Sequence, residues 1–183
     1  MNYGSEIEKV LLTGKQIEIR TQELADEINR DYADKELLVV CILRGGVIFM
    51  ADLFKRLTVD AEMDFLAVSS YGAGTTSSGE VKVMKDLSAP VDRKHILVIE
   101  DIIDTGITLS YIMEMLSARK PSSIKLCSLL DKPSRRKVDL FGDYVGFEIP
   151  NEFVVGYGLD YDEKFRNLPD VCVLSPSVYE KNN

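Results

Sequence analysis

The sequence predicts an α/β fold with a mainly parallel central sheet, and two observations carry this prediction. Short uncut apolar runs, such as residues 37–43 and 96–99, are typical of strands that are buried on both faces of a parallel sheet. Segments with apolar residues at helical spacing, such as residues 47–57, alternate with these runs, as in chains built from strand-helix-strand units. With 183 residues the chain suits a single domain, residues 1–183, with a core of ordinary size.

The other elements follow from the same two patterns in chain order. Helices are expected where apolar residues recur every three or four positions, at residues 5–12, 16–33, 47–57 and 109–119. Strands are expected where short apolar runs are bounded by turn residues, at residues 37–43, 63–70, 81–85, 96–99, 123–130, 144–148, 153–158 and 171–174. The last of these is a candidate edge strand, and Thr108 is expected to cap the helix at 109–119.

The stretch at residues 96–110 carries the most chemical information. Its strand is followed by Glu100, Asp101 and Asp104, and then by a turn of small residues at 105–108. A hydroxyl-rich turn at a helix N-terminus offers backbone N–H groups and a positive dipole end, which suit a phosphate monoester. Carboxylates would repel that phosphate unless they bind sugar hydroxyls or a hard cation such as Mg²⁺. A sugar phosphate with Mg²⁺ fits both halves, and a plain turn with solvated acids is the alternative.

Three further segments fall near this stretch if the sheet is parallel. Arg44 with Gly45, Lys132, and the acidic-basic turn at 160–166 each follow an expected strand. Ligands collect at the carboxyl ends of strands in such sheets, so these segments indicate one active site. Residues 71–80, rich in glycine and hydroxyl side chains, form either a hairpin loop or a lid that excludes water.

Composition and spacing disfavour several classes of function. The net charge of −8 argues against a nucleic-acid-binding surface. No apolar run is long enough to span a bilayer, and the three widely spaced cysteines lie in apolar runs, so we expect a cytoplasmic protein without membrane segments, disulfides or zinc. The single histidine, His95, precedes its strand on the order of 20 Å from Asp101, at roughly 3.3 Å per residue, which is too far for proton transfer.

The motif Glu100-Asp101-Ile102-Ile103-Asp104-Thr105-Gly106-Ile107-Thr108 resembles the phosphoribosyl-pyrophosphate motif of type I phosphoribosyltransferases. Four other motifs are similar to those of bacterial hypoxanthine-guanine phosphoribosyltransferases: Leu43-Arg44-Gly45-Gly46, Ser69-Ser70-Tyr71-Gly72, Leu129-Leu130-Asp131-Lys132-Pro133, and Glu152-Phe153-Val154-Val155-Gly156-Tyr157-Gly158-Leu159-Asp160-Tyr161. The resemblance covers nearly the whole chain from Leu43 and implies the type I phosphoribosyltransferase fold. That fold has a small hood, formed here by the N- and C-terminal parts, and a flexible active-site loop at about residues 70–81.

The resemblance also implies an activity, transfer of the phosphoribosyl group from phosphoribosyl pyrophosphate to N9 of a 6-oxopurine. Hypoxanthine or guanine would give the purine nucleoside monophosphate IMP or GMP and release pyrophosphate, in purine salvage with Mg²⁺ as cofactor. Asp104 is implied as the catalytic acceptor of the proton from purine N7. The residues implied in substrate binding are Arg44, Gly45, Ser70, Tyr71, Glu100, Asp101, Thr105, Gly106, Ile107, Thr108, Lys132, Phe153, Val154, Asp160 and Arg166.

Individual roles in the base site follow from the same resemblance. Lys132 would donate to purine O6, a contact that rejects adenine because its 6-amino group is also a donor. Phe153 would stack on the base, and Val154 would present backbone groups to its edge. The loop at Ser70 and Tyr71 would close to keep water from the reacting sugar.

The remaining roles concern the phosphates, the ribose and the metal. Residues 104–108 would hold the 5′-phosphate, and Arg44, Gly45 and Arg166 would grip pyrophosphate. Glu100 and Asp101 would hold the ribose hydroxyls and the metal environment, with Asp160 binding a second Mg²⁺.

Two departures from common family patterns leave the preference among hypoxanthine, guanine and xanthine open. A lysine is common in the family where Arg44 stands, and some members have a lysine where Ile107 stands. Two alternative functions also stay open: a non-catalytic sensor or regulator with this fold, and a phosphoribosyltransferase for another base. The resemblance implies a homodimer or homotetramer, and no nucleic-acid or membrane partner is expected.

Overall fold

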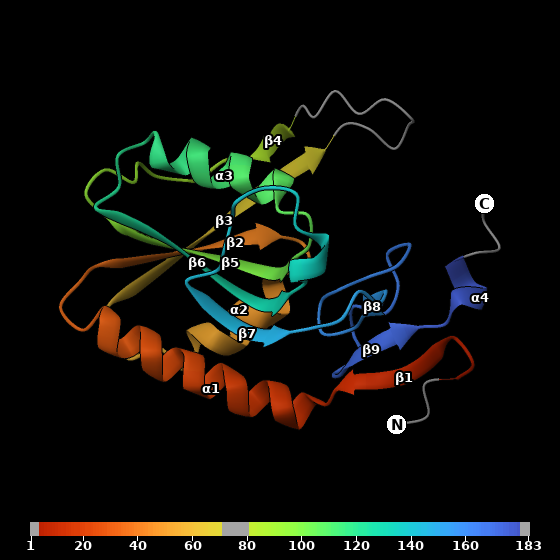
Figure 1. The fold of residues 1–183 in the computed structure, drawn as a ribbon. Helices are drawn as coiled ribbons and strands as arrows, with labels where there is room; N and C mark the ends of the chain where they lie inside the picture. Colours follow the sequence, from red (N-terminus) through yellow and green to blue (C-terminus); the bar gives the residue numbers. More distant parts are fainter. Residues whose placement is uncertain (1–3, 71–80, 180–183) are drawn as a thin grey trace.

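A six-stranded sheet forms the centre of the computed structural model, which describes residues 4–70 and 81–179 (Figure 1). The strands of this sheet are β2 (Leu37–Leu43), β3 (Ala61–Ser70), β4 (Val81–Lys85), β5 (His95–Ile103), β6 (Ser123–Asp131) and β7 (Tyr144–Glu148). Their order is β4-β3-β2-β5-β6-β7, and all neighbouring pairs are parallel except β3 with β4. The predicted α/β fold with a mainly parallel sheet is therefore confirmed.

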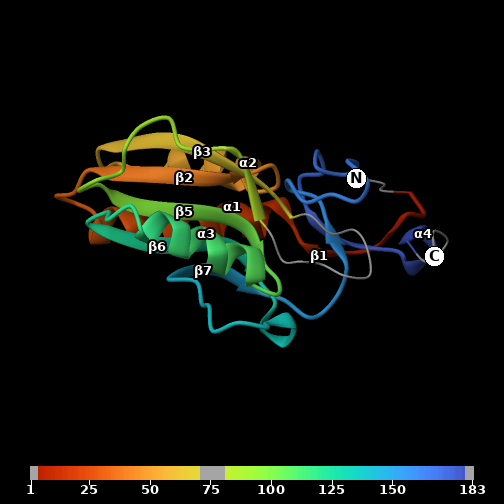
Figure 2. The same cartoon turned by 90° about the horizontal axis from the view of Figure 1, so that it is seen from above.

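Helices cover both faces of this sheet, which explains why the inner strand β2 is apolar without interruption. The helices α1 (Gly14–Asp31) and α2 (Val47–Phe54) lie on one face, and α3 (Ile107–Ser117) lies on the other (Figures 1 and 2). Along β2, Val39 packs with the first pair of helices and Val40 packs on the side of α3. Successive side chains of a strand point to opposite faces, so a strand covered on both sides needs apolar residues at every position.

The long helix α1 begins two residues before the predicted start. Thr13 is its N-cap, and its hydroxyl accepts a hydrogen bond from the backbone N–H of Gln16, while the Gln16 side chain accepts one from the N–H of Thr13. This reciprocal capping box satisfies backbone donors that would otherwise lack partners at the helix start.

A second, three-stranded sheet joins the two ends of the chain. It is built from β1 (Ile7–Leu12), β8 (Val154–Val155) and β9 (Val171–Leu174), in the antiparallel order β1-β9-β8. Three predictions are wrong here: residues 5–12 contain the strand β1 rather than a helix, residues 153–158 contain only a short strand that lies outside the main sheet, and β9 is central rather than an edge. Register shifts break the pairing of β1 with β9 in two places, which removes the simple alternation expected of a strand.

The strand β5 is four residues longer at its carboxyl end than predicted. Its pairing with β2 ends at Ile99, but its pairing with β6 continues to Ile103, so Glu100 and Asp101 lie within the strand rather than after it. The helix α3 then starts at Ile107 with Gly106 as its N-cap, and no side chain caps it. The prediction that Thr108 caps this helix is wrong, because Thr108 lies inside its first turn.

Two short elements complete the described part of the chain. The 3₁₀ turn η1 (Pro133–Arg135) follows β6, and the short helix α4 (Pro176–Tyr179) follows β9. Within residues 4–70 and 81–179, no helix has both the length and the apolar character needed to cross a membrane. Figure 2 shows the small sheet beyond the carboxyl ends of the central strands, which is where the candidate site lies.

Candidate functional site

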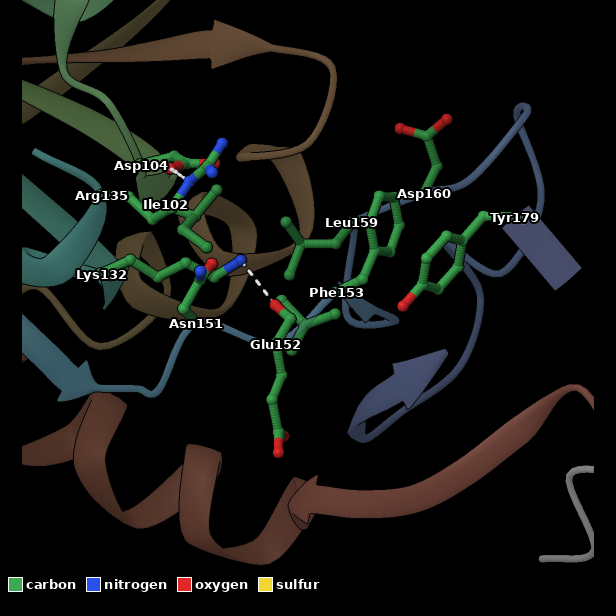
Figure 3. Close-up of a pocket in the computed structure, with 11 residues that line it drawn as sticks. Ile102, Asp104, Lys132, Arg135, Asn151, Glu152, Phe153, Leu159, Asp160 and Tyr179 are labelled. Atoms are coloured by element: carbon green, nitrogen blue, oxygen red, sulfur yellow. Dashed lines mark hydrogen bonds and ion pairs between the residues drawn. The ribbon is translucent and has the colours of Figure 1, made fainter. Parts of the chain in front are cut away.

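A cavity of about 430 Å³ lies between the carboxyl ends of the central strands and the small sheet (Figure 3). Its walls come from several separate stretches of the chain and consist of Ile102, Asp104, Lys132, Arg135, Asn151, Glu152, Phe153, Val154, Leu159, Asp160 and Tyr179. A second pocket of about 170 Å³ shares Ile102 and Asp104 with it and continues to the start of α3. The two pockets together offer space for a ligand with an apolar part and an anionic part.

Lys132 supplies a buried cation to the larger cavity. Its backbone N–H donates to the carbonyl of Ile103 at 3.0 Å, which fixes the segment after β6 beside the end of β5. Its Nζ donates to the carbonyl of Glu152 at 2.7 Å, and the residue is only 7% exposed. Burial lowers the pKa of Lys132. An ammonium group has three donors, so Nζ can still donate to an acceptor on a ligand.

Asp104 lines both pockets and is held by two arginines from the segment after β6. Its Oδ1 accepts a hydrogen bond from Nε of Arg135 at 3.0 Å, and its carbonyl accepts one from Nη1 of Arg136 at 2.8 Å. Arg136 also forms a largely buried ion pair with Asp131. Sequence reasoning gave neither arginine a role, and the basic run that follows Lys132 was the signal that could have identified them.

The turn between β5 and α3 provides a cradle for an anion. Thr105, Gly106 and Thr108 line the smaller pocket at the N-terminus of α3, where the first backbone N–H groups have no acceptor within the helix. Gly106 has a φ of +79°, and a Cβ there would lie 2.9 Å from Val138 Cγ2, so this position requires glycine. Ile107, the first residue of α3, is exposed.

Glu100 and Asp101 form an acidic pair at the end of β5. Burial raises the pKa of Glu100 well above its ordinary value, and the neighbouring charge of Asp101 raises it further. Burial also raises the pKa of Asp101. Within the described part of the chain, the buried Oε2 of Glu100 has no hydrogen-bond partner. One Asp101 oxygen accepts from the N–H of Ile102 at 2.7 Å, and the other lies against Gly45, where any Cβ would overlap it.

This acidic pair fits a hard cation, because carboxylate oxygens are the ligands that Mg²⁺ prefers. Asp160 does not form a metal site together with Glu100 and Asp101. In residues 4–70 and 81–179, no group of three or more His, Cys, Asp or Glu side chains is placed to hold a metal ion. A cation held here would therefore take its other ligands from water and from the phosphate oxygens of a bound substrate, as Mg²⁺ commonly does.

Opposite this pair, the turn after β8 presents a network of arginines and carboxylates. Nη2 of Arg166 lies 2.7 Å from Asp160 Oδ1 and 3.3 Å from Glu163 Oε2, and its Nη1 donates to the carbonyl of Gly158 at 2.9 Å. Arg44, which follows β2, places Nη2 at 2.6 Å from Glu163 Oε1. The backbone at Gly158 packs directly on Gly45, where a Cβ would collide with the Gly45 carbonyl. The predicted residues Arg44, Gly45, Asp160 and Arg166 are thus brought together.

The far wall of the larger cavity is aromatic. Phe153 is 42% exposed; its ring stacks on Tyr179 with centroids 5.2 Å apart and meets Tyr161 edge-on at 5.6 Å. Val154 is buried in β8 behind this ring. Figure 3 shows the Phe153 and Tyr179 rings together, across the cavity from Lys132. Tyr179 was missed by sequence reasoning, and no pattern around it distinguishes it from other aromatic residues.

The side chains of Ser70 and Tyr71 are not described, and His95 lies far from the pockets. Ser70 ends β3, and only its backbone is described, while Tyr71 and the rest of the predicted loop at 71–80 lie outside the described residues. His95 starts β5 at the opposite end of the sheet, where its Nδ1 is 2.7 Å from the hydroxyl of Ser123. Its position agrees with a structural role.

Comparison with known proteins gives consistent results. The chain matches the phosphoribosyl transferase domain family over residues 9–162. It is 54% identical over 175 residues to the hypoxanthine-guanine phosphoribosyltransferase of Bacillus subtilis, covering 96% of this chain and 97% of that protein, and 51% identical over 176 residues to the one from Streptococcus thermophilus, covering 96% and 98%. The structure of a hypoxanthine phosphoribosyltransferase from Staphylococcus aureus superposes with a TM-score of 0.92 at 49% identity, covering 95% of each chain. The chain therefore belongs to the phosphoribosyltransferase family, whose fold and sequence it shares along nearly its whole length.

Proposed function

We propose that this protein transfers the 5-phosphoribosyl group from phosphoribosyl pyrophosphate to N9 of hypoxanthine or guanine, releasing pyrophosphate and forming IMP or GMP in purine salvage. One observation supports this most strongly: a single cavity brings together the ammonium of Lys132, the carboxylate of Asp104 and the ring of Phe153, and it borders an anion cradle at α3. The names of the relatives, hypoxanthine-guanine phosphoribosyltransferases, agree with this substrate pair.

The base site follows from the chemistry of its walls. The Lys132 ammonium donates to a carbonyl oxygen, so it favours O6 of a 6-oxopurine and disfavours the 6-amino group of adenine. Phe153 lines the cavity and is 42% exposed, so its ring can stack on a base, and the backbone at Val154 meets the edge of the base. Asp104, on the other side of the cavity, accepts the proton that N7 loses as N9 bonds to the anomeric carbon.

The sugar and its phosphates occupy the other half of the site. Residues 104–108 bind the 5′-phosphate through backbone N–H groups at the start of α3, and Glu100 and Asp101 bind the ribose hydroxyls and Mg²⁺. Arg44, Gly45 and Arg166 bind the leaving pyrophosphate, and Asp160 helps to bind a second Mg²⁺. When bound, Mg²⁺ would neutralise charge that develops on the leaving group as the anomeric C–O bond breaks.

Several wider features belong to the same proposal. The chain works as one phosphoribosyltransferase domain in which the small sheet is the hood, and the loop at Ser70 and Tyr71 shields the reacting sugar from water. The protein assembles as a homodimer or homotetramer, a proposal that rests on family membership. We place it in the cytoplasm, because Cys41, Cys127 and Cys172 are buried free thiols that suit a reducing compartment.

An assay of nucleotide formation tests this function. The purified protein is incubated with phosphoribosyl pyrophosphate, Mg²⁺ and one base at a time: hypoxanthine, guanine, xanthine or adenine. Nucleotide formation is followed by absorbance. Product from hypoxanthine or guanine but not from adenine is expected. Product from adenine alone would indicate a different base, and no product from any base despite binding of phosphoribosyl pyrophosphate would indicate a metabolite sensor.

A further inference from the structure

Glu163 joins the two arginines that the proposed function assigns to pyrophosphate. Its Oε1 lies 2.6 Å from Nη2 of Arg44, and its Oε2 lies 3.3 Å from Nη2 of Arg166. Because the two oxygens of a carboxylate flank one carbon atom, both guanidinium groups converge on a small volume of negative charge. One phosphate group of a diphosphate presents oxygens of the same kind, and guanidinium groups bind carboxylates and phosphates in similar ways.

The turn that carries Glu163 is shaped to direct its carboxylate at these arginines. Asp162 and Glu163 have φ values of +51° and +61°, which are uncommon for residues other than glycine. The N–H of Glu163 donates to Oδ2 of Asp160 at 3.0 Å, and Oδ1 of Asp160 pairs with Arg166 at 2.7 Å. Such backbone conformations persist where surrounding contacts impose them, and here the contacts include the arginine network itself.

The ion pair of Glu163 with Arg44 is easily exchanged. The two side chains are 59% and 67% exposed, and exposed ion pairs contribute little net free energy. A diphosphate group with bound Mg²⁺ would offer the arginines more oxygens than one carboxylate can. The ion pairs of Glu163 with the two arginines are therefore weak enough for a diphosphate ligand to replace them.

We propose that Glu163 is an internal placeholder for the diphosphate group: it holds Arg44 and Arg166 together in the ligand-free protein, and pyrophosphate or phosphoribosyl pyrophosphate displaces it. This inference rests on the proposed function. Competition by Glu163 would weaken the binding of diphosphate ligands and would favour the release of pyrophosphate after transfer.

Removing the charge of Glu163 tests this role. Glu163→Gln keeps the size of the side chain, and the matched control Asp162→Asn removes the same charge from the neighbouring residue, whose carboxylate forms no ion pair within the described residues. Calorimetric titration with pyrophosphate and Mg²⁺ should show binding about two- to tenfold tighter for Glu163→Gln, because the ion pairs of Glu163 with Arg44 and Arg166 no longer compete. Asp162→Asn should bind pyrophosphate nearly as the wild type does.

Two further measurements isolate competition at the arginines from a general change in the site. IMP carries its single phosphate at the start of α3, so its affinity should be the same in the wild type, Glu163→Gln and Asp162→Asn. Glu163→Ala, which removes both acceptor oxygens, should tighten pyrophosphate binding as Glu163→Gln does.

Three outcomes would overturn the inference. Unchanged or weaker pyrophosphate binding by both Glu163 variants would do so while leaving the proposed function standing. If Asp162→Asn tightened pyrophosphate binding as much as Glu163→Gln does, the cause would be the lower overall negative charge, and the inference would also be overturned. If the wild-type protein bound neither pyrophosphate nor IMP, the proposed function would fail together with the inference.

Discussion

Replacing Lys132 by methionine should remove most of the preference for 6-oxopurines. Methionine keeps the length and apolar stem of the side chain, so the 7% exposed position stays filled while the ammonium donor is lost. A hydrogen bond from a charged donor contributes roughly 1.5–3 kcal/mol. We expect kcat/KM for hypoxanthine and guanine to fall about 10- to 150-fold, since 1.36 kcal/mol corresponds to about tenfold.

The assay is steady-state nucleotide formation with each base at saturating phosphoribosyl pyrophosphate. Lys94→Met is the matched control, because Lys94 pairs with Glu62 at 2.6 Å near the amino ends of the strands, away from the cavity. The affinity for phosphoribosyl pyrophosphate should not change, because Lys132 does not line the smaller pocket. A kcat/KM for hypoxanthine within about twofold of the wild-type value would refute this reasoning, since even the low end of the hydrogen-bond range exceeds that change.

Three other substitutions test separate parts of the structure. Asp104→Asn should reduce kcat roughly 10²–10⁴-fold, the usual range for a general base, while phosphoribosyl pyrophosphate still binds in a direct titration; near-normal turnover would exclude Asp104 as the base. Gly45→Ala should weaken the binding of phosphoribosyl pyrophosphate with Mg²⁺, because the new Cβ would displace the Asp101 carboxylate; wild-type affinity in the same titration would contradict this. Burial opposes ionisation of Asp64, but hydrogen bonds from two backbone N–H groups and Lys85 outweigh it and lower its pKa to about 2. Because this value lies below the 3.8 of an unperturbed group, the ionised Asp64 stabilises the fold above about pH 4, and this stabilisation is lost as the pH falls towards 2. Asp64→Asn should therefore lower the free energy of unfolding in urea by about 2 kcal/mol at pH 7. If the difference in stability between the variant and the wild type did not shrink below about pH 4, this role of Asp64 would be wrong.

Local sequence patterns predicted the central sheet well because burial on both faces leaves an unambiguous signal. The strand at Leu37–Leu43 has the same bounds in the sequence and in the structure. The strand β1 was missed because its register shifts against β9 disturb the alternation of apolar side chains. The carboxyl end of β5 was placed too early because pairing with β6, rather than apolar character, carries that strand on to Ile103.

The same contrast holds for the candidate site. Acidic residues and glycines at the ends of strands are visible in the sequence, and the structure brings Gly45 and Asp101 into direct contact. Arg136, Tyr179 and Glu163 matter because the fold places them beside Asp104, Phe153 and Arg44, respectively. Such partners lie far apart in sequence or in segments without a regular pattern, so their roles cannot be obtained from local sequence.

A crystal structure of the protein with IMP, pyrophosphate and Mg²⁺ would show directly where the base and both phosphate groups bind. We expect the 5′-phosphate at residues 104–108, a hydrogen bond from Lys132 to O6 of the base, and pyrophosphate between Arg44 and Arg166. A base bound away from Phe153 and Lys132, or pyrophosphate bound away from both arginines, would show that the site is assigned wrongly.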